Sequence, residues 1–358
     1  MEDLLMSDKI VIKSKFKEYD VEFIYDLTDH LLNNFDESAV LVIDSHVYAI
    51  YKNELSAVTE KFRTVFLAPE ESAKTVDYAQ EIIEKLLDCT VRKTDTLVAI
   101  GGGITQDIVA FISSIIFRGV NWVFYPTTLL AQADSCIGSK SSINFKKYKN
   151  LLGTFNPPNH IYIYPVFLKS LSESEIRSGI GEIMHYFLND DLEKAERLMA
   201  VHQEILKDVS IIVPFIKESL LVKKAIIEID EFDTNIRHIF NYGHTFGHAI
   251  EAITNYAIPH GQAVSIGMNI ANYFSLEKGM ITKEVFLKMY ELLKLNMPEF
   301  KITNDNIDIY CGALSKDKKN VGAKLGCILT EGPGKMKKCF MEMDDAFKTS
   351  LLDYSQQY

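Results

Sequence analysis

Cysteine is sparse in this chain of 358 residues, and no two cysteines form a recognisable motif. The five cysteines lie far apart and include no CxxC pair; they are Cys89, Cys136, Cys311, Cys327 and Cys339. A disulfide framework or a structural zinc knuckle needs closer, paired spacing. We therefore expect reduced thiols and a cytoplasmic protein.

The chain also lacks a long run of basic residues and a long run of apolar residues. Its 38 Lys and Arg against 49 Asp and Glu give a formal net charge of −11, which repels phosphate backbones and anionic lipids. The apolar stretch Ile108 to Phe117 is about half as long as a membrane span. The opening segment, MEDLLMSDKI, has acidic residues where a signal peptide needs a basic region. We expect no nucleic-acid partner, no membrane partner and no secretion.

Apolar residues make up 47% of the chain, which is enough for more than one compact core. The first half predicts an α/β domain, because short runs rich in β-branched residues alternate with helical patterns. The expected strands are 40–44, 96–100, 122–125 and 161–164, and the expected helices cover 70–87 and begin near 105. Such β-α units place the strands in a parallel sheet.

The second half of the chain has a different character. Long segments with helical periodicity cover 173–188, 192–207 and 213–229, and few runs there are typical of strands. We expect an α/β domain over residues 1–165 and an all-α domain over residues 166–358, with the boundary near 160–170.

Three glycines, Gly101 to Gly103, follow the expected strand TLVAI and precede a helix. Glycines at this point let a backbone approach a pyrophosphate, and a helix N-terminus favours the anion. The run is not GxGxxG, because Gln106 stands at the last position, and no Gly-Lys-Ser/Thr follows as in a P-loop. A tight turn that only needs a positive φ explains the glycines equally well.

Three histidines lie within 17 positions, at His244, His248 and His260. His244 and His248 are one helical turn apart, which is a workable spacing for two metal ligands. Thr245 stands where a zincin protease has its glutamate, so that class is disfavoured. Single histidines are often structural, but three so close favour a metal site, and a carboxylate from elsewhere is required if one of them has another role.

Basic and amide side chains gather beside these motifs, although the chain is acidic. They suit a substrate with phosphate and carboxylate groups. Alternatively, Lys149 and Lys223 lie on solvated faces. The set is Arg118, Lys140, Lys149, Asn150, Lys223, Arg237 and Asn241.

The chain resembles the sugar phosphate cyclases, and among them the dehydroquinate synthases most closely. The resemblance extends from about residue 68 to about residue 334, and it rests on several motifs in the same order. These are GGGITQD (101–107), FRG (117–119), PTTLLAQADSCIGSKSSIN (126–144), KNLLGTF (149–155), GEIMH (181–185), RHIFNYGHTFGHAIE (237–251), HG (260–261) and DKK (317–319).

The resemblance implies an N-terminal NAD-binding α/β domain and a C-terminal helical domain that binds zinc, or cobalt in its place. Glu182, His244 and His260 would hold the metal, and His248 would contact the substrate phosphate. Arg118 would reach the active site of a neighbouring subunit, which implies a homodimer.

Two further sets of residues follow from the same resemblance. The substrate set is Asp134, Lys140, Asn150, Lys223, Arg237, Asn241, His248 and Lys318. The NAD set is Asp44, Glu71, Lys74, Gly101, Gly102, Gly103, Ile104, Thr105, Gln106, Asp107, Thr127, Thr128, Lys140, Lys149, Phe167, Leu168, Lys169 and Ser170.

The family's reaction oxidises a substrate hydroxyl with NAD beside the metal, eliminates phosphate, returns the hydride, and closes a carbocycle by ring opening and an aldol step. Retention of Lys223, Arg237 and Asn241 favours a carboxylate-bearing substrate, 3-deoxy-arabino-heptulosonate 7-phosphate, with 3-dehydroquinate as product.

The chain departs from the family pattern at two positions. His185, which we include among the active-site residues, stands where the family has a lysine, and Ser139 stands inside the usual GGK. The alternatives are a cyclase of another sugar phosphate such as sedoheptulose 7-phosphate, a metal-dependent polyol or glycerol-phosphate dehydrogenase, and a catalytically silent NAD-binding paralogue.

Overall fold

The structure is a computed structural model that describes residues 9–68, 70–146, 148–316, 320, 322 and 324–358. The chain folds into two compact units. The first unit contains Met1–Leu171 and also Ile227–Phe232, and the second contains Ser172–Ile226 and Asp233–Tyr358. Residues 166–171 and 227–232, which the sequence-based division assigned to the second domain, therefore pack with the first unit.

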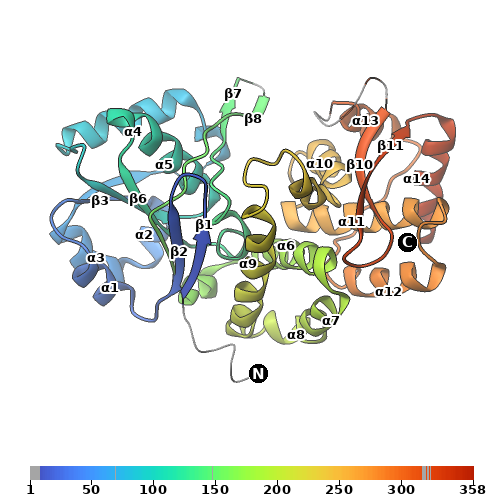
Figure 1. The fold of residues 1–358 in the computed structure, drawn as a ribbon, viewed down its shortest axis with the longest axis horizontal. Coiled ribbons are helices and arrows are strands. Elements are labelled where there is room, and N and C mark those ends of the chain that lie inside the picture. The colour runs from blue at the N-terminus through green and yellow to red at the C-terminus, as the bar shows by residue number, and fades with distance from the viewer. Residues whose placement is uncertain (1–8, 69, 147, 317–319, 321, 323) are drawn as a thin grey trace. The chain divides into compact units, whose positions relative to one another are not determined.

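A sheet forms the centre of the first unit, and in the described residues it has seven strands in the order β1-β2-β9-β6-β5-β3-β4. Only the β1–β2 pairing is antiparallel, and the other neighbours run parallel (Figure 1). The strands are β1 (Lys9–Lys13), β2 (Glu18–Phe23), β3 (Ala39–Asp44), β4 (Arg63–Leu67), β5 (Thr96–Gly101), β6 (Asn121–Pro126) and β9 (His160–Ile163).

Helices cover both faces of this sheet, because its central strands are apolar on both sides. On one face, Leu41 and Val98 pack with residues of α1 (Leu27–Asn34) and α3 (Lys52–Lys61). The alternate strand residues face the other way, where α4 (Val76–Asp88) and α5 (Gly103–Ile115) lie. This is the predicted α/β arrangement.

Shorter elements complete the first unit. They are α2 (Ser45–Ile50), η2 (Glu71–Ala73), η3 (Ile116–Arg118), the π-helical turn η4 (Ala131–Ser135), η5 (Pro165–Ser170) and the hairpin of β7 (Ile143–Phe145) with β8 (Tyr148–Leu152). The sequence analysis did not predict this hairpin, nor β1, β2 and β4.

The second unit is helical, as predicted, and it also contains a two-stranded sheet of β10 (Lys324–Thr330) and β11 (Met336–Glu342). Its helices are α6 (Glu173–Asp190), α7 (Leu192–Ala200), α8 (His202–Ile205), η6 (Val209–Ile212), α9 (Val213–Ile227), η7 (Ile236–Asn241), α10 (His244–Ile253), α11 (His260–Glu277), α12 (Lys283–Leu293), α13 (Ile307–Leu314) and α14 (Asp345–Gln357).

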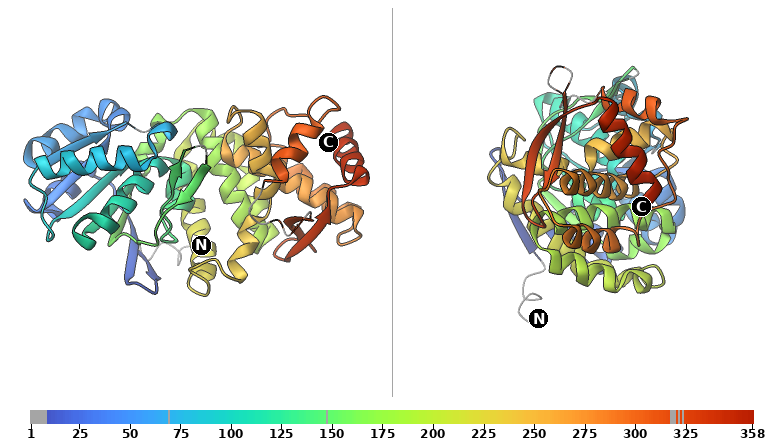
Figure 2. Two further views of the ribbon diagram at one scale, coloured as in Figure 1. Left: turned by 90° about the horizontal axis from the view of Figure 1, so that it is seen from above. Right: turned by 90° about the vertical axis from the view of Figure 1, so that its right-hand side faces the viewer.

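Helix α11 is the core of the second unit. It is buried along nearly its whole length, and α6, α10 and α12 pack against it (Figures 1 and 2). A helix that is buried on all sides needs neighbours on all sides. The packing of α10 and α6 against α11 places the starts of α10 and α11 near the middle of α6.

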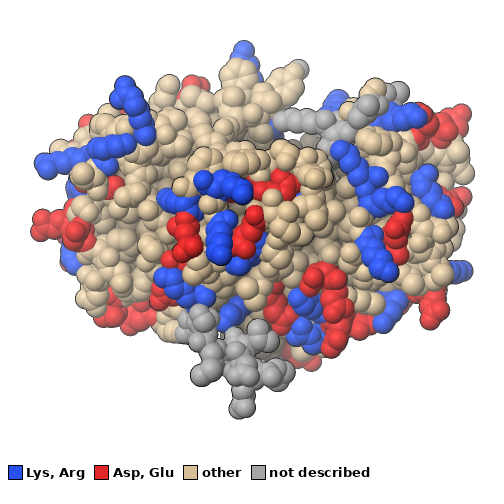
Figure 3. Space-filling view, viewed as in Figure 1, with Lys and Arg blue, Asp and Glu red and all other residues tan. Residues whose placement is uncertain are grey.

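Two expectations from composition can be compared with the structure. All five cysteines lie in the described part of the chain, and none of them is in a disulfide there. No helix in the described residues combines the length and the apolar character needed to cross a membrane. On the face drawn in Figure 3, basic and acidic side chains are interspersed.

Candidate active site

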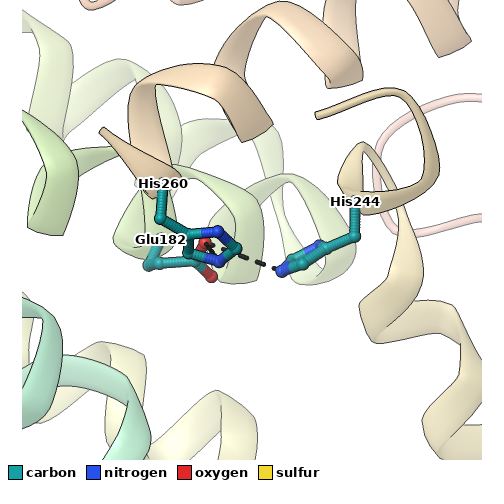
Figure 4. A group of neighbouring side chains, drawn as sticks. All are labelled: Glu182, His244 and His260. Atoms are coloured by element: carbon teal, nitrogen blue, oxygen red, sulfur yellow. Dashed lines mark ion pairs between the residues drawn. The ribbon is translucent and has the colours of Figure 1, made fainter. Parts of the chain in front are cut away.

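Three side chains from three helices of the second unit meet at one point (Figure 4). Glu182 comes from the middle of α6, and His244 and His260 are the first residues of α10 and α11. His260 Nε2 lies 3.2 Å and His244 Nε2 lies 3.6 Å from the Glu182 Oε1 atom. Their potential ligand atoms all lie within 4.8 Å of one another, so the three could bind one ion.

Glycines allow the helices that carry the histidines to approach closely. A Cβ on Gly267 of α11 would lie 2.1 Å from the Gly243 carbonyl oxygen, at the start of α10. A Cβ on Gly247 of α10 would lie 3.0 Å from the Ala263 carbonyl oxygen. A Cβ does not fit at the first distance and would force its neighbours to shift at the second, so glycines at these two positions permit the approach that brings His244 toward His260.

The second ring nitrogen of each histidine has a partner that orients the ring. His244 Nδ1 lies 3.1 Å from the Tyr242 carbonyl oxygen, and His260 Nδ1 lies 3.1 Å from Glu251 Oε2. Because these oxygens accept hydrogen bonds, Nδ1 is the donor and Nε2 is directed toward Glu182. The buried Glu182 Oε1 receives no hydrogen bond from the described residues.

These observations fit a divalent cation. Two imidazoles and a carboxylate are ligands that zinc uses in catalytic sites, where a further position stays open. A buried carboxylate oxygen without a hydrogen-bond donor is unusual, and an ion held with His244 and His260 would satisfy it. Glu182, His244 and His260 would therefore hold the metal.

Without a metal ion, the pKa values of His244 and His260 shift in opposite directions. Burial lowers the pKa of His244 to about 3, so this imidazole is neutral and available as a ligand. Burial also disfavours charge on His260, but its contacts with Glu182 and Glu251 outweigh that effect and hold the pKa of His260 well above its ordinary value.

His185 does not lie on an open surface. Its side chain is 1% exposed, and its Nδ1 lies 3.8 Å from Glu182 Oε2. The ring packs against Tyr186 and His244, with ring centroids 5.1 and 4.8 Å away. A residue included among the active-site candidates thus contacts the metal-ligand candidates and an aromatic cluster.

Lys223, Arg237 and Asn241 are further candidates of the second unit. Lys223 on α9 is buried, and its Nζ lies 5.9 Å from the centre of the Tyr186 ring. Arg237 on η7 is also buried, and Asn241 Nδ2 donates to the His238 carbonyl oxygen at 3.1 Å.

His248 and Lys318 complete the candidates of the second unit. His248 is exposed, and its ring stacks on His260 with the centroids 5.6 Å apart. Lys318 lies outside the described residues.

In the first unit, the glycines Gly101 to Gly103 lie where β5 ends and α5 begins, as predicted. Among the described residues, no side chain caps the first turn of α5, so the N–H groups of Gly103, Ile104 and Thr105 have no capping partner from a side chain there. A Cβ on Gly102 would lie 3.1 Å from the Thr128 methyl group. An uncapped helix start behind glycines fits a pyrophosphate group, and hence a dinucleotide.

Gln106, the residue that departs from GxGxxG, has a structural partner in this cradle. Its Nε2 donates to the Ser135 carbonyl oxygen at 2.6 Å, and its Oε1 accepts from Ser135 Oγ at 2.7 Å. The side chain is 6% exposed. Gln106 therefore fastens the π-helical turn η4, which carries Asp134, to the start of α5.

Several predicted NAD and substrate residues form one polar network in the first unit. Lys74 Nζ donates to Asp107 Oδ2 at 3.0 Å and to Asn150 Oδ1 at 2.7 Å. Glu71 lies 3.9 Å from Lys74 and 3.8 Å from Lys149. Burial raises the pKa of Asp107, although Lys74 opposes this. The structure thus brings together residues that were assigned to NAD and one assigned to the substrate.

Other candidates of the first unit have simpler environments. The Asp44 carboxylate caps α2 by accepting from the His46 and Val47 N–H groups. The Thr127 N–H donates to the Gly101 carbonyl oxygen at 2.9 Å.

In the segment 167–170 of η5, the side chains of Phe167 and Leu168 are buried in the core, whereas Lys169 and Ser170 are exposed. Phe167 and Leu168 could therefore reach a cofactor only through their backbone groups.

Arg118 is exposed at a tight turn after α5. Phe117, Arg118 and Gly119 all have positive φ, and Lys93 Nζ donates to the carbonyl oxygens of Phe117 and Gly119. The turn is therefore held in one conformation that presents Arg118 at the surface.

Sequence reasoning missed Glu251, the partner of His260 Nδ1. The only available signal was its place at the end of the motif RHIFNYGHTFGHAIE, two helical turns after His244. His248, Glu251 and His260 also have potential ligand atoms within 4.8 Å of one another.

Comparison with known proteins agrees with this geometry. Residues 64–178 match the family 3-dehydroquinate synthase N-terminal, and residues 179–320 match 3-dehydroquinate synthase C-terminal. The chain is 33% identical over 352 residues to the 3-dehydroquinate synthase of Thermoanaerobacter pseudethanolicus, covering 95% of this chain and 99% of that protein. It is 36% identical over 336 residues to the enzyme of that name from Dictyoglomus turgidum, covering 92% and 94%.

Solved structures share the fold. The chain aligns with a 2-epi-5-epi-valiolone synthase from Streptomyces hygroscopicus with NAD+ and Zn2+ bound, at a TM-score of 0.84, 24% identity and coverage of 98% and 100%. A 2-deoxy-scyllo-inosose synthase complexed with carbaglucose-6-phosphate, NAD+ and Co2+ aligns at a TM-score of 0.83 and 21% identity, covering 97% of this chain and 99% of that chain. A glycerol dehydrogenase from Schizosaccharomyces pombe aligns at a lower TM-score of 0.59 and 14% identity, covering 94% of this chain and 89% of that chain.

The α/β unit with its glycine cradle, the helical unit with its Glu-His-His cluster and these likenesses define the sugar phosphate cyclase class. Within it, the matches over both halves of the chain and the identities above 30% are decisive. The chain belongs to the 3-dehydroquinate synthase family, which confirms the resemblance found in its motifs.

Proposed function

We propose that this chain is an NAD-dependent and divalent-metal-dependent 3-dehydroquinate synthase that converts 3-deoxy-arabino-heptulosonate 7-phosphate into 3-dehydroquinate and phosphate. The observation that carries the proposal is the convergence of Glu182, His244 and His260, with both Nε2 atoms directed at one carboxylate. The metal would be zinc or cobalt, the ions that the structurally similar cyclases contain. When bound, the metal would supply a Lewis acid at a substrate hydroxyl and NAD would accept and return a hydride.

The chain's own residues then have defined tasks. The uncapped start of α5 would hold the cofactor pyrophosphate, and the network of Lys74 and Asp107 would fix the cofactor's surroundings. In the second unit, the buried cations Lys223 and Arg237 would bind the anionic groups of the substrate. Positioning of these anions supports elimination of phosphate, because the leaving group is held in a fixed geometry.

A second candidate function rests on His185. This residue is buried among aromatic rings and replaces a long cation with a short imidazole. Such a change favours a substrate with a different anion pattern, such as sedoheptulose 7-phosphate. Both candidates are sugar phosphate cyclases, so they share the metal and NAD residues.

We also propose a cytoplasmic homodimer in which Arg118 contributes to the partner's active site. Arg118 is exposed beside Phe117 and Ile115, which are 40% and 47% exposed, and exposed apolar side chains around a cation suit a protein interface. Cysteines outside disulfides support a reducing compartment. Sedimentation analysis tests the dimer, and activity recovered by mixing Arg118→Ala with Glu182→Gln subunits tests the shared site.

The decisive experiment follows NADH absorbance and phosphate release together over a panel of sugar 7-phosphates and 3-deoxy-arabino-heptulosonate 7-phosphate, with products identified by mass. Catalytic phosphate release without net NADH supports a cyclase, and the product identifies the substrate. Stoichiometric NADH without phosphate would indicate a dehydrogenase and contradict the proposal. Turnover of sedoheptulose 7-phosphate alone would favour the second candidate.

The metal assignment has its own test. Glu182→Gln is expected to lose bound metal and activity, because it removes the charge between the two histidines. Glu173→Gln is the matched control, since Glu173 lies on the same helix and its side chain is 63% exposed. Unchanged metal content in Glu182→Gln would show that the ion binds elsewhere.

A further inference from the structure

The turn before Lys140 contains an unusual backbone conformation. Gly138 and Ser139 have φ of +106° and +66°, and such left-handed values favour glycine. Ser139 carries a side chain there, and that side chain is buried while Lys140 is exposed. Something must therefore hold Ser139 in place.

Two contacts hold it: the Asn156 N–H donates to the Ser139 carbonyl oxygen at 2.7 Å, and the Ser139 side chain bonds to the carboxylate of Glu231, which is 5% exposed. Ser139 Oγ donates to Glu231 Oε1 at 2.6 Å. A side chain at this position disfavours a left-handed φ, but its hydroxyl also forms a hydrogen bond that stabilises this conformation. A hydrogen bond to a buried carboxylate is stronger than one between neutral groups.

Glu231 is itself anchored to the N-terminal hairpin. Ser14 Oγ donates to Glu231 Oε1 and the Lys15 N–H donates to Glu231 Oε2, both at 2.6 Å. The rest of the turn is also fastened, because the Gly138 N–H donates to the Tyr19 hydroxyl at 3.1 Å. The carboxylate thus connects the turn to a fixed part of the first unit.

The place of Glu231 in the chain gives this contact a meaning. It lies in Ile227–Phe232, the segment that packs with the first unit between two segments of the second. This segment follows Lys223 and precedes Arg237, and both are candidate substrate residues. We propose that Glu231 and Ser139 are positioning residues that set the direction of Lys140, and with it the affinity for NAD and for the anionic sugar. The inference rests on the proposed function only in assigning Lys140 to these two ligands.

The test compares alanine, glycine and glutamine substitutions. Ser139→Ala keeps the Cβ but loses the hydrogen bond to Glu231. It should weaken NAD binding about tenfold and raise KM for the sugar phosphate about tenfold, with a smaller change in kcat. Ser139→Gly should retain more NAD affinity than Ser139→Ala, because glycine adopts the left-handed conformation without help. An affinity of Ser139→Ala equal to the wild type would overturn the proposal.

A double-variant cycle separates positioning from general support of the fold. Glu231→Gln alone should weaken NAD binding about tenfold, whereas adding it to Ser139→Gly should change the affinity by less than about twofold. Equal losses in both backgrounds would mean that Glu231 acts through the hairpin and would overturn the proposal. If Glu231→Gln does not fold, the order of Ser139→Ala and Ser139→Gly decides.

Ser14→Ala is the matched control, because it removes the other hydroxyl bonded to the same carboxylate oxygen. It should lower the melting temperature and leave NAD affinity unchanged, because the Lys15 N–H still anchors Glu231 and the bond from Ser139 remains. NAD affinity, measured by calorimetry without substrate, keeps this test independent of the reaction. If the wild type binds NAD but turns over no sugar phosphate, the proposed function fails while the order of the variants still decides this inference.

Discussion

Gly181 of α6 and Gly261 of α11 meet backbone to backbone, one residue before Glu182 and one residue after His260. A Cβ on Gly181 would lie 2.0 Å from the Gly261 carbonyl oxygen, and a Cβ on Gly261 would lie 1.8 Å from the Ser178 carbonyl oxygen. The Gly261 N–H also donates to Ser178 Oγ at 3.1 Å. The contact of these two glycines brings two metal-ligand candidates from different helices together.

The first prediction is that Gly261→Ala separates α6 from α11. The added methyl has no room beside the Ser178 backbone, so the helices must move apart, which we expect to destabilise the fold by about 3 kcal/mol and to abolish metal retention. Thermal unfolding and metal content of the purified protein measure both effects.

Gly312→Ala is the control for Gly261→Ala. Gly312 also lies in a helix, α13, but a Cβ there meets nothing within 4 Å, so alanine should stabilise the protein slightly. Full metal content in Gly261→Ala would show that the approach of the helices is not needed for the site.

The second prediction concerns Glu251, which orients His260 through Nδ1. Glu251→Ala should lower the metal affinity about 10–100-fold, the usual effect of removing such a partner. Glu251→Gln should lose less, because its amide oxygen still accepts from Nδ1 but lacks the charge. Competition with a chromophoric chelator measures the affinity.

Glu277→Gln is the matched control for these variants, since Glu277 lies at the exposed end of the same helix as His260. We expect its metal affinity to equal that of the wild type. If Glu251→Ala also matched the wild type, the hydrogen bond to His260 would have no part in holding the ion.

The central strands of the first unit and the main helices of both units could be predicted because their patterns are local. Val40 to Asp44 and Thr96 to Ile100 are apolar on both faces, which is typical of central parallel strands. The strand β1, KIVIK, is short and alternates between exposed and buried residues at the sheet edge, so it lacks that signal.

The site could be predicted only in part, for a similar reason. His244 and His248 are close in sequence, so their spacing indicated a metal site without any tertiary information. The contact of Ser139 with Glu231 joins residues that are 92 positions apart, and the left-handed φ of Ser139 is visible only in the folded chain. The burial of His185 likewise depends on Tyr186, Phe240 and Tyr242 packing around it.

The third prediction is a loss of stability in mild acid that depends on His202. This side chain is 1% exposed, and Arg177 Nη1 lies 3.4 Å from its Nε2. Burial, and then the Arg177 charge, lower the pKa of His202 below its ordinary value of 6.5. Below pH 6.5 the unfolded chain therefore binds a proton that the folded chain resists, and stability falls with pH until the folded pKa is reached.

His202→Gln should accordingly have a flatter melting-temperature profile than the wild type between about pH 7 and about pH 5.5. His46→Gln is the control, because His46 is exposed and its replacement should leave the profile unchanged. Parallel profiles for the wild type and His202→Gln would assign the acid sensitivity to other groups.

The fourth prediction uses the start of α5, where stability and cofactor binding should respond in opposite directions. Gly103 is the first residue of the helix, no acidic residue lies in its first turn, and the nearest atom to an added Cβ is Ser135 Oγ at 3.9 Å. Gly103→Asp therefore has room, and its carboxylate should stabilise the helix by about 0.3–1 kcal/mol. The same carboxylate would occupy the place of the pyrophosphate, so NAD affinity should fall at least about tenfold. Gly103→Ala is the control, because it adds the Cβ without the charge. It should lose less NAD affinity than Gly103→Asp, and the difference in affinity between the two variants is then due to the charge. Equal NAD affinities for Gly103→Asp and Gly103→Ala would place the pyrophosphate away from this helix, and the glycines would then serve only the turn between β5 and α5.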